Sequence, residues 1–256
     1  MFTIIETVKA AALPQAPTLS VVIPAFNEEA RLPATLDRIR GYLQGAALGP
    51  WEVIVCDDGS TDGTAQMVTE LMKADAALRL ISYRPNRGKG YAVRQGMLAA
   101  QGQWRLLTDA DLSAPIEDLQ RLLEAAHREH AQIVIGSRAL DRSLIGVHQP
   151  VAREYAGRLF NLAVRWITGL PFRDTQCGFK LFAAAAAQIV FSRQQLEGFG
   201  FDVEVLYIGR LHGLKILEVP VHWNNVEGTK VSLLRGVDSF LDLLRIRRHA
   251  ARGAYR

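Results

Sequence analysis

The chain has 256 residues, 49% hydrophobic and 22% charged, with two cysteines and a formal net charge of +4. This is the composition of a soluble globular protein long enough for one large domain, and two cysteines favour a reducing compartment over a disulfide framework. No apolar run approaches the roughly 18 residues of a membrane span, and no apolar core follows a basic start, so we expect neither a transmembrane helix nor a signal peptide.

The predicted elements alternate along the first 136 residues. Short runs rich in Val, Ile and Leu, bounded by turn residues, predict strands at 19–24, 52–56, 78–83, 105–108 and 133–136. Helical patterns lie between them at 28–43, 64–74, 90–100 and 116–130. This alternation predicts an α/β fold, with a mainly parallel sheet and helices on both faces.

The pattern changes after about residue 150. We expect helices at 152–166, 183–187 and 201–211, a polar stretch at 173–178 and a late strand at 215–223. A last segment has a single apolar face at helical spacing, which predicts an amphipathic helix. That face is formed by Leu233, Leu234, Val237, Phe240, Leu241 and Leu244. The expected organisation is an extension at 1–18, one domain at 19–230 and a basic amphipathic helix at 231–256.

The positive charge is concentrated at the C-terminus. Residues 235–256 hold six arginines and two aspartates, a net +4, so the remaining residues sum to zero. A neutral body with a basic tail indicates an anionic surface as partner, either membrane or nucleic acid. The alternative is a solvated helix end.

Two acidic clusters follow predicted strands. Asp109-Ala110-Asp111 ends the run at 104–108, and Asp57-Asp58 ends the run at 52–56. Ligands of parallel sheets bind beyond the carboxyl ends of the strands, where both clusters fall. Mg²⁺ held by two carboxylates completes its shell with water and phosphate oxygens, which predicts a metal–diphosphate ligand. For either cluster an ordinary turn is the alternative. Motifs for dinucleotide, P-loop or serine-hydrolase sites are missing from the sequence.

The motifs together resemble a known family. The stretches 20–29, 57–64, 86–90 and 109–111 resemble family 2 glycosyltransferases of the GT-A fold, in particular those that glycosylate polyprenyl phosphates. The stretches 174–182 and 201–207 are similar to dolichyl-phosphate β-glucosyltransferases, and dolichyl-phosphate mannose synthases are the second match. The resemblance covers about residues 19–245 and implies that 19–230 is the catalytic domain.

The resemblance implies a role for residues on the donor side. The nucleotide sugar would contact the ends of the first two strands, with Asp57 and Asp58 at the base and ribose, and the loop before the third helix, where Gly88 and Lys89 would line the base pocket. It would also contact Asp109-Ala110-Asp111, called the acidic triplet below, and a later Gly-containing loop. These residues are Pro24, Ala25, Asn27, Glu28, Asp57, Asp58, Gly88, Lys89, Asp109, Ala110 and Lys230. A helix-capping turn is the alternative for Asp58, and solvated surface loops are the alternative for Gly88, Lys89 and Lys230.

Metal and acceptor roles follow from the same resemblance. Asp109 and Asp111 would bind Mg²⁺ or Mn²⁺, and Ser113 stands where mannose synthases have a metal-facing Gln. Asp174 would lie near the reacting centre. Three guanidinium groups are candidates for the acceptor phosphate, because the guanidinium fork matches phosphate oxygens; surface charge is the alternative. They belong to Arg138, Arg142 and Arg153, and the expected catalytic set is Asp111, Asp174 and Arg138.

The implied reaction is inverting transfer of a hexose, glucose from UDP-glucose, to a polyprenyl or dolichyl phosphate. Three competing interpretations stay open: a mannosyltransferase that uses GDP-mannose, a family 2 transferase with a soluble acceptor, and a sugar-nucleotide-binding module without turnover. We expect peripheral association with the cytoplasmic face of a membrane, through an anionic surface, and no nucleic-acid partner.

Overall fold

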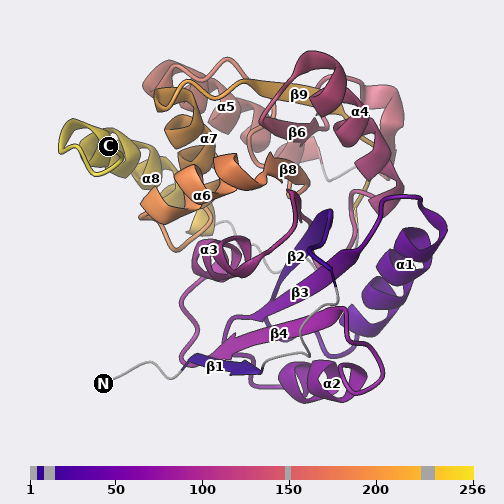
Figure 1. The fold of residues 1–256 in the computed structure, drawn as a ribbon. Coiled ribbons are helices and arrows are strands. Elements are labelled where there is room, and N and C mark those ends of the chain that lie inside the picture. Colours follow the sequence, from indigo (N-terminus) through magenta and orange to yellow (C-terminus); the bar gives the residue numbers. More distant parts are fainter. Residues whose placement is uncertain (1–4, 9–14, 148–150, 226–233) are drawn as a thin grey trace.

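The computed structural model describes residues 5–8, 15–147, 151–225 and 234–256, and within these ranges it places eight strands in one sheet (Figure 1). The strands of this sheet are β1 (Ile5–Val8), β2 (Leu19–Ala25), β3 (Trp51–Asp57), β4 (Leu78–Tyr83), β5 (Trp104–Leu107), β6 (Ile133–Ser137), β8 (Lys180–Ala183) and β9 (Ile216–Pro220). A separate small sheet pairs β7 (Ile145–Val147) with β10 (Trp223–Asn224).

The helices connect these strands. They are α1 (Leu32–Gly45), α2 (Thr64–Leu71), α3 (Lys89–Ala99), α4 (Leu119–Glu129), α5 (Val151–Thr168), α6 (Ala184–Arg193), α7 (Phe201–Leu211) and α8 (Leu234–Ala251). Short 3₁₀ turns occupy Ile116–Asp118 and Arg142–Leu144. No helix in the described part of the chain is long and apolar enough to cross a membrane.

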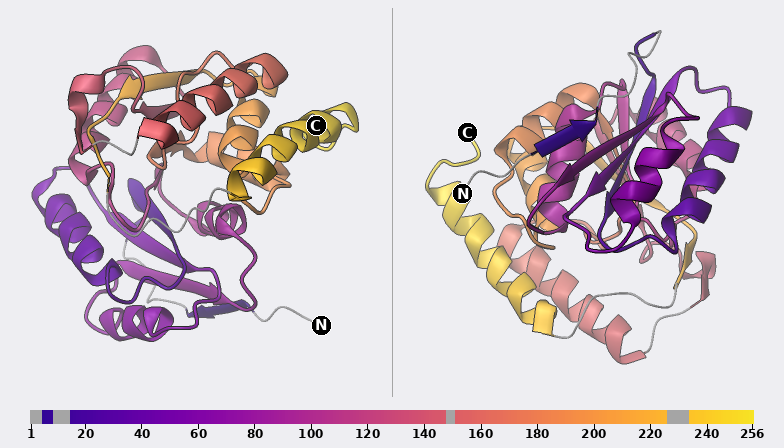
Figure 2. Two further views of the ribbon diagram at one scale, coloured as in Figure 1. Left: turned by 180° about the vertical axis from the view of Figure 1, so that it is seen from behind. Right: turned by 90° about the horizontal axis from the view of Figure 1, so that it is seen from below.

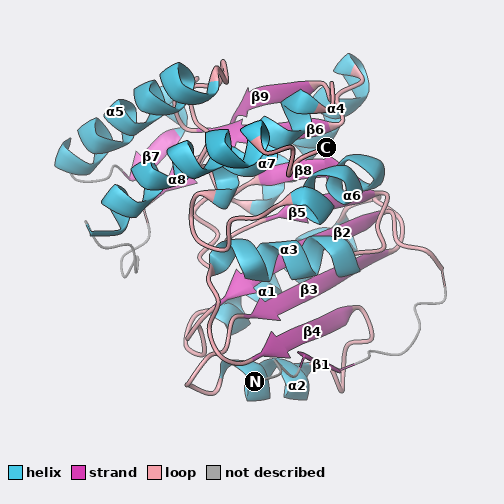
Figure 3. Ribbon diagram, turned by 90° about the vertical axis from the view of Figure 1, so that its left-hand side faces the viewer, coloured by secondary structure: helices cyan, strands magenta, loops and turns pink. Residues whose placement is uncertain are grey.

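The sheet is mainly parallel, as predicted. Its order is β1-β4-β3-β2-β5-β8-β6-β9, which Figure 3 shows from the bottom to the top of the molecule. β4, β3, β2 and β5 are mutually parallel, and so are β6 and β9. Between these groups β8 runs antiparallel to both neighbours, and β1 is antiparallel to β4 at the edge. The predicted α/β class is confirmed.

Helices cover both faces because alternate strand residues point to opposite sides of the sheet. In β2, Val22 packs into one core cluster, whereas Val21 and Ile23 pack into another. The first cluster lies under α3, α6 and α7, and the second lies under α1, α2 and α4. A strand buried on both faces must be apolar along its whole length, which is why the runs are continuous and do not alternate with polar residues.

The strands at 19–25, 51–57, 78–83, 104–107 and 133–137 agree with prediction within one residue at each end. The first helix begins at Leu32 rather than at residue 28, with Pro33 in its first turn, where the missing N–H costs nothing. The predicted strand at 215–223 is two strands, β9 and β10. Two strands of the sheet, β1 and β8, were not predicted. β1 lies in the expected extension at 1–18. β8 follows the expected polar stretch at 173–178 and includes Ala183, where a helix was expected to begin.

Candidate active site

The strands β2, β3, β5 and β6 all end on the same side of the sheet. This side, formed by the carboxyl ends of the strands, is called the edge below. β8 runs in the opposite direction, so the segment that precedes it reaches the same edge. The loops that start at Phe26, Asp58, Thr108 and Arg138 therefore converge with the 174–178 segment. The structure thus brings the described donor-side residues, Arg138 and Asp174 to the same edge.

Asp58 organises the donor side. Its carboxylate is 3% exposed and accepts four hydrogen bonds: from the Tyr83 hydroxyl at 2.9 Å, and from the Asn86 amide and the backbone N–H groups of Arg87 and Gly88 at 2.8 Å each. Burial raises the pKa of Asp58, and these hydrogen bonds oppose the rise. Asp58 therefore holds the 86–88 loop in place, and a direct contact with base or ribose stays a prediction.

Glycines allow this loop to approach closely. Gly59 has a φ of +71°, and a Cβ there would lie 2.7 Å from the backbone nitrogen of Asn86. Gly88 has a φ of +114°, and its Cβ would lie 2.5 Å from the carbonyl oxygen of Glu197. Both positions need the left-handed region that glycine enters without strain. Gly88, which was predicted to line the base pocket, is thus required by the backbone conformation of the loop.

The other donor-side residues make hydrogen bonds within and around the loop after β3. Asp57 accepts from the Ser60 backbone at 3.2 Å and from the Ser82 hydroxyl at 2.8 Å. The Asn27 amide oxygen accepts from the Thr61 backbone at 2.8 Å, and the Glu28 backbone donates to Thr64. Pro24 and Ala25 end β2, opposite Cys56 and Asp57 in register. Asn27 and Glu28 are partly exposed at the edge, as a nucleotide contact would require.

Lys89 lies beside the acidic triplet. Its ammonium is 2.6 Å from a carboxylate oxygen of Asp109. Burial alone would lower the pKa of Lys89, but the carboxylates of Asp109 and Asp202 outweigh burial and raise it. Lys89 is therefore a cation at neutral pH. The base-pocket role remains a prediction, and the observed position suits contact with phosphate.

The acidic triplet has the donor set for a hard divalent cation. Asp109 and Asp111 are both partly exposed, and one oxygen of Asp111 accepts from the Ser113 backbone at 3.0 Å. Thr35 of α1 donates to the Ala110 carbonyl at 2.6 Å, which fixes the turn between the carboxylates. Two carboxylates with room for water and phosphate oxygens fit Mg²⁺ or Mn²⁺. A metal that binds Asp109 would compete with the Lys89 ammonium.

The acceptor side is built on an arginine–aspartate pair. Arg138 follows β6 and donates from Nε and Nη2 to the two oxygens of Asp174 at 2.6 and 2.8 Å, and from its backbone N–H at 3.0 Å. Burial would raise the pKa of Asp174, but the guanidinium outweighs it and holds the pKa below its ordinary value. Asp174 is 2% exposed, whereas the Arg138 side chain is 28% exposed. The arginine, with donors to spare, is the member of the pair that can reach a ligand.

Two residues of this side were missed by sequence reasoning. A carboxylate oxygen of Glu218 in β9 accepts from the backbone N–H of Asp174 at 2.7 Å and from the Ser137 hydroxyl at 2.7 Å. Gly178 lies against the acidic triplet, because a Cβ there would be 2.0 Å from an Asp109 oxygen. An isolated Glu in a late strand gives no sequence signal, since only the pairing of β6 with β9 brings it to the site.

Three predicted phosphate-contacting residues remain. Arg142 is exposed in the 3₁₀ turn after β6. Arg153 belongs to the first turn of α5, where its side chain is not described. Lys230 lies outside the described residues. Their predicted contacts with phosphate groups therefore stay predictions.

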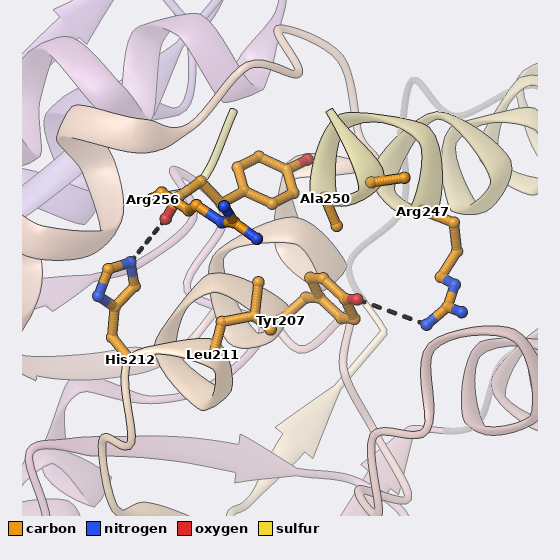
Figure 4. Close-up of a pocket in the computed structure, with 8 residues that line it drawn as sticks. Tyr207, Leu211, His212, Arg247, Ala250 and Arg256 are labelled. Atoms are coloured by element: carbon orange, nitrogen blue, oxygen red, sulfur yellow. Dashed lines mark hydrogen bonds between the residues drawn. The ribbon is translucent and has the colours of Figure 1, made fainter. Parts of the chain in front are cut away.

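The structure also has a cavity outside this edge of the sheet. It has a volume of about 430 Å³ and lies between α7 and α8 (Figure 4). Arg247 approaches the Tyr207 hydroxyl at 3.5 Å across it, and the His212 ring is 2.7 Å from the Tyr255 carbonyl oxygen. These contacts attach the C-terminal helix to the domain, away from the carboxyl ends of the strands.

Known proteins resemble the chain over most of its length. The dolichyl-phosphate β-glucosyltransferase of Homo sapiens is 36% identical over 255 residues, which cover 93% of this chain and 77% of the human protein. That of Saccharomyces cerevisiae is 34% identical over 256 residues, with coverage of 93% and 76%. The crystal structure of M. tuberculosis glucosyl-3-phosphoglycerate synthase matches with a TM-score of 0.64 at 22% identity, covers 90% of this chain and 80% of that one, and confirms the expected fold.

The family assignment rests on a direct match as well. The model of glycosyl transferase family 2 matches residues 20–187, which include all but the first residue of β2, all of β3, the acidic triplet and all of β8. This match spans more than half of the chain and confirms the predicted class of enzyme. The chain belongs to glycosyl transferase family 2.

Proposed function

We propose that the protein transfers glucose from UDP-glucose to a polyprenyl phosphate of the dolichyl type, with inversion at the anomeric carbon. The relatives named dolichyl-phosphate β-glucosyltransferase support the donor sugar and the acceptor class. The observation that carries the proposal is the 174–178 segment: Asp174 at its start pairs with Arg138, and Gly178 at its end lies against Asp109. One edge of the sheet thus offers a diphosphate-binding half and a phosphate-binding half.

The chain's own residues have defined tasks in this reaction. Asp109 and Asp111 would hold Mg²⁺ or Mn²⁺, which supplies Lewis-acid stabilisation of the leaving diphosphate. The M. tuberculosis synthase has been crystallised with Mn²⁺ and UDP-glucose, which supports this choice of cation. Lys89 adds a second positive charge beside Asp109. Electrostatic stabilisation of developing charge is commonly a large part of catalysis.

The acceptor half needs no strong base. The nucleophile is a phosphate oxygen, which is already ionised at neutral pH. Asp174 is paired with Arg138 and stays ionised, so it orients the guanidinium instead of accepting a proton. We therefore expect Arg138→Ala to weaken use of the polyprenyl phosphate more than UDP-glucose binding. A change confined to donor affinity would assign Arg138 to the nucleotide half.

Association with an anionic membrane surface is part of the proposal, and exposed apolar side chains on two packed helices support it. Leu159, Leu162 and Trp166 are exposed at helical spacing on α5. Phe240, Leu241 and Leu244 are exposed on α8. The two helices lie side by side (Figure 2), and the ring centroids of Phe160 and Phe240 are 5.2 Å apart. An interfacial helix binds lipid through such an apolar face together with basic side chains.

α8 turns a different face towards the domain. Leu243 and Ile246 are completely buried, whereas Arg245, Arg248 and Arg252 are exposed. Of the predicted apolar face, Leu233 lies outside the described residues, and the side chains of Leu234 and Val237 are not described. Each arginine near an anionic surface contributes on the order of 1 kcal/mol. We place this surface at the cytoplasmic face of a membrane; the buried, unpaired Cys56 and Cys177 agree with a reducing environment.

A donor panel tests the proposal. UDP-glucose, UDP-galactose, UDP-GlcNAc and GDP-mannose are each offered with a short polyprenyl phosphate, and lipid-linked product is measured. We expect UDP-glucose to be preferred, and preference for GDP-mannose would support the mannosyltransferase alternative instead. Asp111→Ala should lower turnover at least roughly 10²-fold, as loss of one charge stabiliser does. Full turnover by this variant in chelator would refute the metal assignment.

A further inference from the structure

Two charged residues beneath the site take no direct part in the proposed reaction. Lys180 is the first residue of β8, and Asp202 lies in the first turn of α7. Their side chains are 2.5 Å apart, and the residues are 0% and 3% exposed. Neither is accessible to a ligand, so any effect on the reaction must pass through neighbouring groups.

Lys180 makes a second contact that points towards the site. Its ammonium donates to the carbonyl oxygen of Cys177 at 2.6 Å, so it fixes the end of the 174–178 segment. The start of this segment is fixed independently, by the hydrogen bond from the Asp174 backbone to Glu218. A buried cation of β8 and a carboxylate of β9 thus hold the two ends of the same short segment.

The position of this segment matters to both halves of the site. At its start, the Asp174 side chain orients Arg138. At its end, the Gly178 backbone lies so close to Asp109 that an added Cβ would displace the carboxylate. A shift of Cys177 and Gly178 towards the edge would displace the Asp109 carboxylate, and a shift away would open space beside it.

Stability alone does not account for a lysine in this place. Removing two charges from water costs free energy that their attraction seldom fully offsets, and apolar replacements of similar volume are often neutral or stabilising. The geometry supplies a specific use, since the ammonium is the group that binds the Cys177 carbonyl, and Asp202 supplies the charge that keeps it buried there.

We propose that Lys180 and Asp202 are positioning residues, which hold Cys177 and Gly178 against Asp109 and so set the metal-binding carboxylate relative to the Arg138–Asp174 pair. This inference rests on the proposed function, in which Asp109 contributes to the metal–diphosphate site. The hydrogen bond to the Cys177 carbonyl is the essential feature, and the ion pair provides its charge balance.

Two charge-neutral double variants of the full chain separate this hydrogen bond from the ion pair. Lys180→Met/Asp202→Asn removes the donor to Cys177, whereas Lys180→Gln/Asp202→Asn keeps an amide donor. Glu52→Gln is the matched control, because Glu52 is a buried carboxylate paired with Arg79 near the amino end of β3, at the opposite edge of the sheet. Mn²⁺ affinity in the presence of UDP is measured by electron paramagnetic resonance, together with kcat, KM and Tm.

We expect the Met variant to bind Mn²⁺ at least fivefold more weakly than the Gln variant and to lose kcat in parallel, with wild-type donor KM. Rescue by Gln is the readout that a merely structural role would not give. A folded Met variant whose Mn²⁺ affinity is within fivefold of the Gln variant overturns the inference. If Lys180→Met/Asp202→Asn does not fold, the Mn²⁺ affinity of Lys180→Gln/Asp202→Asn decides. An affinity within fivefold of wild type supports the inference, and a weaker affinity overturns it. Wild-type protein without UDP-dependent Mn²⁺ binding would instead refute the proposed metal site itself.

Discussion

Trp166 offers the sharpest test of the membrane surface. It lies near the end of α5 and is 88% exposed, which is unusual for so large an apolar side chain. We predict that Trp166→Ala weakens binding to anionic vesicles without loss of fold or of UDP binding. The reason is that nothing in the described structure covers the ring, so its removal leaves no internal cavity.

The magnitude follows from the exposed area. A tryptophan side chain offers on the order of 200 Å², and 88% of Trp166 is exposed. At about 25 cal/mol per Å², complete transfer of this surface from water would contribute ~4 kcal/mol. If about half of it enters the acyl region of an interfacial helix, the loss is ~2 kcal/mol, or roughly 30-fold in affinity.

Sedimentation with vesicles of defined anionic-lipid content measures this change. Trp166→Phe should lose less, because a ring remains. Tyr42→Ala is the control, since it removes a partly exposed ring from α1 on the opposite face of the sheet, and it should bind as wild type does. Equal vesicle affinity of Trp166→Ala and wild type would show that α5 does not meet the bilayer.

Three further predictions concern the site. Gly178→Ala should lower kcat on the order of 10²-fold, because its Cβ would displace the Asp109 carboxylate; unchanged kcat in a steady-state assay would contradict this close approach. Lys89→Met should raise the Mn²⁺ affinity of nucleotide-free protein roughly fivefold. The reason is that the Lys89 ammonium, which competes with the metal for Asp109 by ~1 kcal/mol, is removed. Titration with Mn²⁺ in the absence of UDP checks this. The pKa of Asp174 is lowered on folding, so its contribution to stability is present above about pH 4 and is lost as the pH falls through the folded value. Urea unfolding should show the deficit of Asp174→Asn at pH 7 shrinking below about pH 4, and a constant deficit would argue against the ion pair.

The sequence was most informative where local pattern and topology agree. The runs at 19–24 and 52–56 predicted strands within a residue, because a strand buried on both faces must be apolar throughout. The parallel sheet then placed Asp57 and Asp109 at the carboxyl ends of the strands, whereas Arg138 was proposed from the family resemblance.

Other features depend on contacts between distant segments. β8 was missed because it begins with Lys180, a charge that is tolerated in the core only through Asp202, 22 residues later. The Lys89–Asp109 pair was missed because α3 and β5 must first pack together. Helical spacing predicted a helix at 231–256, and within the described residues α8 runs from Leu234 to Ala251. Spacing alone cannot tell that Leu243 faces the domain while Leu244 faces outwards.

The antiparallel strand β8 has a consequence for the order of folding. In register, Lys180 lies opposite both Leu107 of β5 and Ile135 of β6, so one residue joins the strand that leads to the acidic triplet and the strand that leads to Arg138. These three positions are far apart in sequence, and such long-range pairings form slowly. A slip of one residue would turn Lys180 to the other face of the sheet. During refolding we therefore expect UDP binding with Mn²⁺ to recover later than the helical signal in circular dichroism, so that the ligand reports the completion of the sheet.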